Sequence, residues 1–162
     1  MEQLTLFPPP YKYLIDSSSI LSQKPNEKLP RQVYKTLWDL IDQNIVKQTI
    51  TTCSEIEEEV KKDDLVGNWL HANQCIILPI DDEVQRNVRR IVTEHPKMIS
   101  FAGGKGSSSG DAFLIATAMK HQLMIITEEN KDSLTHIPSI CKCYGIRTVN
   151  LTELCIEEGW TF

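Results

Sequence analysis

Short apolar runs alternate along the chain with longer stretches whose apolar residues recur at helical spacing. The short runs are compact, and several end at a polar residue or a proline, which is typical of buried strands. Asp16 ends the first run and Pro79 ends the third. The predicted strands cover residues 11–15, 49–52, 75–78, 123–126 and 146–150.

The stretches between these runs predict helices. One helical pattern opens at Pro30, and a second follows Ser54, whose hydroxyl is expected to cap the first turn. A third begins near Asp111 and is apolar nearly all round, which indicates a deeply packed helix. The apolar residues that define the predicted faces are Val33, Leu37, Leu40 and Ile41; Ile56 and Val60; Val84, Val88, Ile91 and Val92; and Ala112, Ile115, Ala116 and Met119.

Alternating strands and helices predict an α/β fold, a three-layer α/β/α sandwich with a central, mostly parallel sheet of 4–5 strands. We expect one domain over residues 1–162, with residues 1–10 as an extended lead-in because Pro8, Pro9 and Pro10 are stiff. In such sheets the ligand site lies at the carboxyl ends of the strands. Polar residues that follow a strand are therefore the first candidates for chemistry.

Composition narrows the choice of partners. The chain has 162 residues and a net charge of −5, which excludes nucleic-acid binding through a simple basic surface. A local basic patch from Arg86, Arg89 and Arg90 with Lys61 and Lys62 is the alternative, although such runs are commonly solvated helix faces. No apolar run approaches the ~20 residues of a membrane helix, and the N-terminus does not resemble a signal peptide. We therefore expect a cytoplasmic protein.

Several other kinds of site do not fit the sequence. The five cysteines are scattered and odd in number, which argues against a disulfide framework and a zinc site. The four histidines have no metal or nucleophile spacing. The segment 103–110 lacks both the phosphate-loop pattern and the serine-hydrolase pattern. It reads as a surface loop, or as a flap that brings Lys105 near a substrate phosphate.

Carboxylates follow the predicted strands. Asp16 comes directly after the first strand, Glu128 and Glu129 follow the fourth, and Asp111 opens the buried helix. Two like charges ~4 Å apart repel by roughly 4 kcal/mol at an effective dielectric constant of 20, so a shared pocket needs protons or a cation. Oxygen ligands of this kind, with hydroxyl neighbours Ser17, Ser18 and Thr127, suit Mg²⁺ or Mn²⁺.

Each acid also has a structural interpretation. Asp16 is suited to cap a helix, and Asp111 to interact with a helix dipole. Glu55, Glu57, Glu58 and Glu59 are suited to a solvated helix face, and Glu128 and Glu129 are suited to a surface turn. The metal-site hypothesis depends on all of them meeting at one edge of the sheet.

The order of these segments resembles a PIN domain, the nuclease family that includes the VapC-type toxins, and in particular a PIN-like subgroup described as a domain of unknown function. The resemblance runs from about Tyr11 to Phe162. It is carried by residues 13–19, 55–60, 110–116, 125–129 and 159–162.

The resemblance implies a metal-dependent endoribonuclease that leaves 5′-phosphate and 3′-hydroxyl ends, with Mg²⁺ or Mn²⁺ as cofactor. It also implies an antitoxin partner and a homodimer. By position, Asp16, Asp111 and Ser18 match catalytic residues, and Glu59 matches the helix acid, with Glu55 and Glu58 as competitors. The implied metal ligands are Asp16, Glu59, Asp111 and Glu129, where Glu129 replaces the usual aspartate of Thr-x-Asp.

Two other functions are compatible with an α/β sheet. Because Glu129 departs from the family pattern, a non-catalytic interaction module that has lost full metal binding is the alternative. A receiver-like signalling domain needs an aspartate after the middle strand and a lysine after the last. Leu78–Pro79 and Asn150 occupy those places, so we set that function aside.

Overall fold

Five parallel strands form the centre of the molecule in the order β3-β2-β1-β4-β5. Their bounds are β1 (Tyr13–Ile15), β2 (Ile50–Cys53), β3 (Ile77–Leu78), β4 (Met124–Ile126) and β5 (Thr148–Val149). In the register, Tyr13 of β1 lies opposite Ile50 of β2 and Met124 of β4. The predicted parallel sheet is therefore confirmed, with shorter strands than the apolar runs suggested.

The computed structural model describes residues 10–98, 109–133 and 136–162. The expected lead-in over residues 1–10 falls outside this part, apart from Pro10. The glycine-rich segment with Lys105 also falls outside it, so the flap hypothesis stays a prediction.

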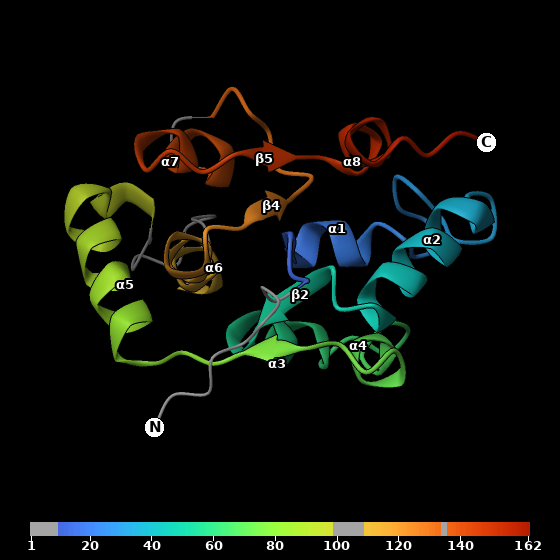
Figure 1. The fold of residues 1–162 in the computed structure, drawn as a ribbon, viewed down its shortest axis with the longest axis horizontal. Helices are drawn as coiled ribbons and strands as arrows, with labels where there is room; N and C mark the ends of the chain where they lie inside the picture. The colour runs from blue at the N-terminus through green and yellow to red at the C-terminus, as the bar shows by residue number, and fades with distance from the viewer. Residues whose placement is uncertain (1–9, 99–108, 134–135) are drawn as a thin grey trace.

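Helices cover the sheet on both faces, which confirms the three-layer sandwich. Figure 1 shows α5, α6 and α7 on one side of the strands and α2 and α8 on the other. The helix bounds are α1 (Ser17–Leu21), α2 (Lys35–Val46), α3 (Ser54–Val60), α4 (Trp69–Ala72), α5 (Asp82–Glu94), α6 (Ser109–His121), α7 (Ile137–Cys143) and α8 (Leu151–Glu158), with a 3₁₀ turn at Pro96–Met98. No helix in the described residues is long and apolar enough to cross a membrane.

The strand order reverses between β1 and β4. From β1 the chain builds outward through β2 and β3, then returns to add β4 and β5 on the other side of β1. In open α/β sheets ligands bind at such a switch point, outside the carboxyl ends of the strands. Asp16 and Thr127, which follow β1 and β4, lie at this point.

Two helix starts differ from the prediction. The helix expected from Pro30 begins at Lys35, because Pro30 closes a separate turn in which its carbonyl accepts from the amide of Tyr34. Val33 is consequently 68% exposed, and the buried face of α2 includes Trp38 instead. Further along, β2 runs directly into α3, so Cys53 occupies the N-cap position and Ser54 is already helical.

The predicted faces of the other helices agree with the structure. Ile56 and Val60 of α3 are buried, as are Val84 and Ile91 of α5. The apolar character of α6 has its expected cause, because α6 is packed between the sheet and α5, and Ala112, Ile115 and Ala116 are fully buried. This burial places Asp111, near the start of α6, close to the core.

Candidate metal centre

Asp16 is held rigidly at the end of β1. The side chain is buried, and the residue is 1% exposed. Its Oδ1 accepts from the amide of Ser17 at 2.8 Å, while Oδ2 accepts from the hydroxyls of Ser18 at 2.6 Å and Thr127 at 2.9 Å. Asp16 is the N-cap of α1, so the structural role that the sequence allowed is also present. Burial raises its pKa, and the hydrogen bonds partly oppose this rise.

The turn after β4 is tied to the turn after β1. The Ser18 Oγ atom lies 3.2 Å from Thr127 Oγ1 and accepts from the amide of Glu128 at 3.1 Å. Thr127 Oγ1 in turn accepts from the amide of Glu129 at 3.1 Å. The two hydroxyls therefore fix Asp16 and the Glu129 backbone relative to each other, although the two segments are more than 100 residues apart.

Asp111, in the first turn of α6, interacts electrostatically with Asp16. It is 5% exposed, and burial is the main reason that its pKa is raised to about 8. The charges of Glu129, Asp16 and Glu59 raise the pKa further, as does a hydrogen bond to Glu129. The neutral form of the Asp111 carboxyl is therefore favoured well above the pH range in which an ordinary aspartate is protonated.

Glu129 and Glu59 complete the group of interacting acids. Burial raises the pKa of Glu129, whereas the amide of Ile137, which donates to its Oε2 at 2.8 Å, lowers it. Burial also raises the pKa of Glu59, followed by the charge of Asp16. Among the described glutamates of α3, Glu58 instead pairs with Lys61 at 2.8 Å on the exposed side.

The four predicted metal ligands thus act on one another electrostatically from β1, α3, α6 and the turn after β4. Across the described residues, however, no group of three or more His, Cys, Asp or Glu side chains stands ready to hold a metal ion. The donors fit Mg²⁺ or Mn²⁺ in kind, since they are carboxylates with neighbouring hydroxyls. The repulsion among these carboxylates, which raises the pKa of Glu59, Asp111 and Glu129, is the second indication that a cation fits here.

Two features of this edge were not anticipated from the sequence. Glu128 does not face the carboxylates; its Oε1 accepts from the amide of Leu151 at 2.8 Å and its Oε2 pairs with Lys28 at 3.0 Å. His136 precedes α7, and its electrostatic influence lowers the pKa of Glu129. Its Nδ1 is buried and lacks a hydrogen-bond partner within the described structure. His136 comes near Glu129 through the fold of the chain before α7. The spacing of residues in the sequence therefore gives no sign of it.

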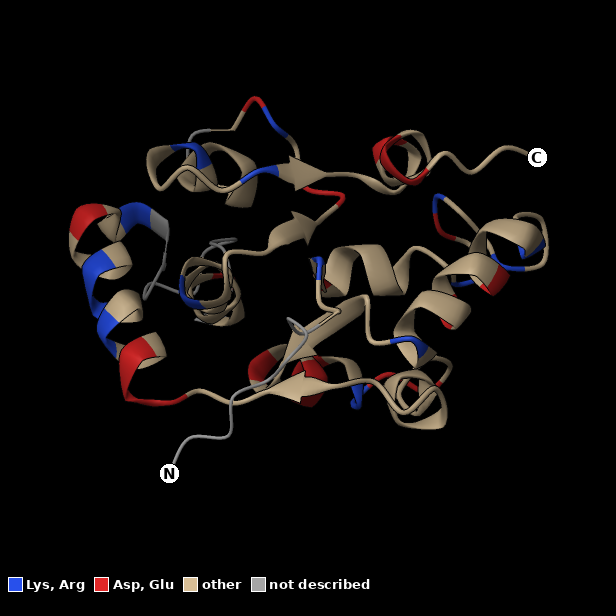
Figure 2. Ribbon diagram, in the orientation of Figure 1, with Lys and Arg blue, Asp and Glu red and all other residues tan. Residues whose placement is uncertain are grey.

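The basic residues considered for nucleic-acid contact do not gather around the carboxylates as one patch. Figure 2 shows the basic segments of α5 on one outer side of the molecule, where Arg86 and Arg89 are exposed. Arg90 pairs with Glu94, and Lys61 with Glu58. The arginines of α5 therefore form a helix face of their own.

Comparisons with solved structures show that the chain has a PIN-like fold. Residues 13–162 match the family described as Domain of unknown function (DUF4411), and the chain belongs to that family. No curated protein matches the sequence.

Three solved structures illustrate the shared fold. FitAB bound to an IR36 DNA fragment aligns with a TM-score of 0.51 and 15% identity over 86% of this chain and 94% of that one. PAE2754 from Pyrobaculum aerophilum aligns with a TM-score of 0.52 and 12% identity, over 94% of this chain and 98% of that one. VapBC2 from Rickettsia felis, bound to a DNA fragment from its promoter, aligns with a TM-score of 0.50 and 13% identity. The alignment covers 85% of this chain and 97% of that one. At these identities the likeness establishes the fold.

Proposed function

We propose that this protein is an Mg²⁺- or Mn²⁺-dependent endoribonuclease and the toxin of a toxin–antitoxin pair. The proposal is supported by the electrostatic interactions that link Asp111 with Asp16, Glu59 and Glu129. Burial raises the pKa of each of them, and the charges of neighbouring carboxylates raise the pKa of Glu59, Asp111 and Glu129 further. Such an arrangement is costly for stability alone, and clustered acids with perturbed pKa values are typical of functional sites.

Asp16, Glu59, Asp111 and Glu129 would hold the cation. When bound, such an ion supplies positive charge next to the scissile phosphate and makes a neighbouring water more acidic. The chain's own residues supply the geometry. Ser18 and Thr127 orient the Asp16 carboxylate through Oδ2, and the Ile137 amide orients Glu129 through Oε2. Glu59 reaches the site from α3, and Asp111 from the first turn of α6, where it interacts with Glu129.

RNA as substrate, an antitoxin as partner, a homodimer and a cytoplasmic location belong to the same proposal. They are supported by the resemblance to VapC-type toxins and by the fold shared with FitAB and VapBC2. The net charge of −5 makes RNA binding dependent on cations and on local arginines or lysines.

A cleavage assay tests the proposal. Wild-type protein with Mn²⁺ should cut single-stranded RNA, and excess EDTA should stop the reaction. Asp16→Asn keeps the shape of the side chain but removes its charge, so cleavage should fall by at least about 100-fold. Asp64→Asn, at an exposed position, is the matched control and should retain full activity. Equal activity in Asp16→Asn and wild type would show that the site is assigned wrongly.

A non-catalytic interaction module is the second candidate. It is favoured by the finding that no three acidic, histidine or cysteine side chains of the described chain are arranged to hold a metal. It is also favoured by Glu129 in place of the usual aspartate. If wild-type protein neither binds Mn²⁺ nor cleaves RNA, the module is the better account.

A further inference from the structure

A second hollow lies at the opposite edge of the sheet, where β4 and β5 begin. Its volume is about 720 Å³, which is within the range of small-molecule sites. The carboxylates follow the ends of β1 and β4, whereas this cavity is lined by Leu123 and Met124 at the start of β4. It is therefore a separate feature from the candidate metal centre.

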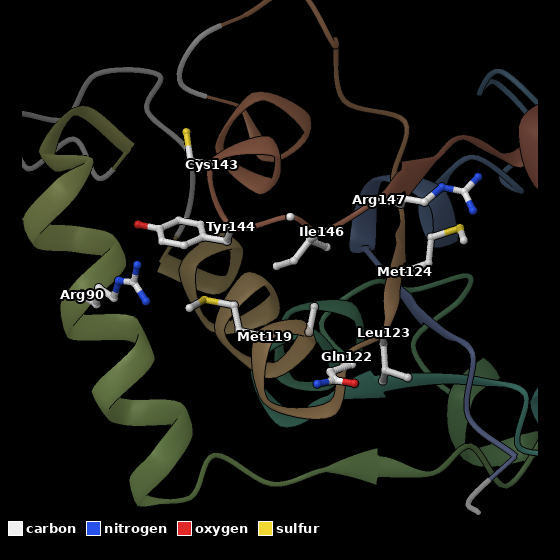
Figure 3. Close-up of a pocket in the computed structure, with 11 residues that line it drawn as sticks. Arg90, Met119, Gln122, Leu123, Met124, Cys143, Tyr144, Ile146 and Arg147 are labelled. Atoms are coloured by element: carbon white, nitrogen blue, oxygen red, sulfur yellow. The ribbon is translucent and has the colours of Figure 1, made fainter.

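Two sharp turns create the cavity. Gln122 ends α6 with a φ of +55°, and Gly145 follows α7 with a φ of +69°. These left-handed turns bring each helix end directly into the next strand, and the hollow lies between the two turns and α5. Figure 3 shows Met119 and Ile146 projecting into the space between α5 and the strands.

The polar wall comes from α5 and the end of α7. The Arg90 guanidinium lies 5.1 Å from the centroid of the Tyr144 ring. Arg90 Nε donates to Glu94 Oε1 at 3.0 Å, and the Tyr144 hydroxyl donates to the same atom at 2.9 Å. Glu94 thus fixes both side chains, while the terminal nitrogens of Arg90 take no acceptor within the described residues. In Figure 3 this guanidinium points toward Met119, across the cavity.

The lining offers guanidinium groups to an anion, and Glu94 and Glu157 pair with them from outside the lining. Arg90 and Arg147 both line the cavity, and none of the described lining residues is acidic. Arg147 extends the other way and makes a fork with Glu157 at 3.2 and 3.1 Å, so Arg90 is the group able to take a ligand. A guanidinium whose terminal N–H groups face a cavity suits a phosphate or carboxylate.

The other lining residues suit a flat ligand group, such as an aromatic ring with polar atoms at its edge. Met119 and Met124 present thioethers, which make favourable contacts with aromatic rings. The Gln122 side chain, at the cavity mouth, offers both a donor and an acceptor to a ring edge. We propose that this cavity binds a nucleoside monophosphate unit, with its phosphate on Arg90, its base on Met119 and Ile146, and the polar edge of the base at Gln122.

Such a unit has two sources, a free nucleotide or the end of an RNA strand. Calorimetric titration with AMP, inorganic phosphate, octanoate and a 5′-phosphorylated RNA tetranucleotide separates them. AMP should bind more tightly than phosphate or octanoate. RNA binding that is at least about tenfold tighter than AMP identifies a strand site, and equal affinity identifies a free-nucleotide site.

Matched variants locate the binding. Arg90→Gln should weaken AMP binding about tenfold or more, because it removes the charge that faces the phosphate. Arg86→Gln, one turn earlier on the exposed face of α5, makes the same change outside the cavity and should alter affinity less than about twofold. Gln122→Gly suits the left-handed backbone, so the fold is kept, and it should weaken AMP but not phosphate.

The titrations are made in EDTA with the Asp16→Asn variant, so their outcome does not depend on the proposed nuclease activity. The proposal is overturned if AMP shows no saturable binding at millimolar concentration. It is equally overturned if octanoate binds better than AMP, or if Arg90→Gln and Arg86→Gln behave alike.

Discussion

At the scale of single residues, Asp16 is the group whose position depends on the most contacts. A buried carboxylate is unfavourable unless hydrogen bonds compensate for the lost water. Ser17, Ser18 and Thr127 provide those bonds from two different turns. Removal of one of these donors should therefore lower both the free energy of unfolding and the activity.

Thr127→Val tests this compensation. The variant keeps the branched shape and removes the hydroxyl that donates to Asp16 Oδ2. Unfolding free energy should fall by about 1.5–3 kcal/mol, as for hydrogen bonds to charged groups. Chemical denaturation measures the change, and Thr93→Val, at an exposed position of α5, is the control with little expected effect. A loss in Thr127→Val no larger than in the control contradicts this role.

The raised pKa of Asp111 predicts an unusual pH dependence of the folding stability of the metal-free protein. Its folded-state pKa is raised to about 8, above the ordinary value of 3.8, so between these pH values the folded state binds more protons than the unfolded state. Stability should therefore fall as pH rises from 5 toward 8, by up to about 1.4 kcal/mol per pH unit for one proton.

Thermal unfolding in EDTA across this pH range measures the effect. Asp111→Asn removes the titrating group, so its melting temperature should depend less on pH and exceed that of wild type at pH 8. A wild-type melting temperature that rises between pH 5 and pH 8 would falsify the raised pKa.

At the scale of elements, the turn after β4 connects three parts of the fold. Glu128 is largely buried, and its Oε1 accepts from the amide of Leu151 at the start of α8. An acidic side chain at this place accepts from a first-turn amide that has no partner within its own helix, and it interacts favourably with the helix dipole. The contacts of Glu128 with Leu151 and Lys28 therefore hold the turn that carries Thr127 and Glu129.

Glu128→Ala should consequently lower the unfolding free energy by about 1–2 kcal/mol. Lys28→Ala breaks the ion pair of the same carboxylate, but Lys28 is 66% exposed, so a loss below about 0.5 kcal/mol is expected. Denaturant titration of both variants measures the difference. Equal losses would mean that the ion pair, rather than the helix cap, anchors the turn.

Strands and buried helices follow directly from the sequence pattern, and helix starts do not. The apolar runs at residues 123–126 and 75–78 contain β4 and β3, because buried parallel strands must be apolar on both faces. The start of α2 was misplaced because Pro30 suits both a helix start and a turn. The helices α4, α7 and α8 were not predicted. The cap of α8 is nevertheless visible in the sequence as Asn150 with Glu153, which form a capping box.

At the scale of the whole molecule, the candidate site depends on topology. The sequence indicated that Asp16, Asp111 and Glu129 were candidates because parallel strands end at the same edge. It left Glu55, Glu58 and Glu59 open, since residues on one helix differ only in the direction of their side chains. The electrostatic interaction of Glu59 with Asp16 required the packing of α3 next to α1. The approach of His136 to Glu129 likewise depends on a loop that no local pattern predicts.

We propose that Asp16, Glu59, Asp111 and Glu129 form one site for a divalent cation. Calorimetric titration of metal-free protein with Mn²⁺ at pH 7, repeated in two buffers of different ionisation enthalpy, tests it most directly. The account predicts saturable binding with proton release, because Asp111 must give up its proton to bind metal. Binding should be lost in Asp16→Asn and kept in Asp64→Asn. Absence of saturable binding, or equal affinity in Asp16→Asn and wild type, contradicts the account.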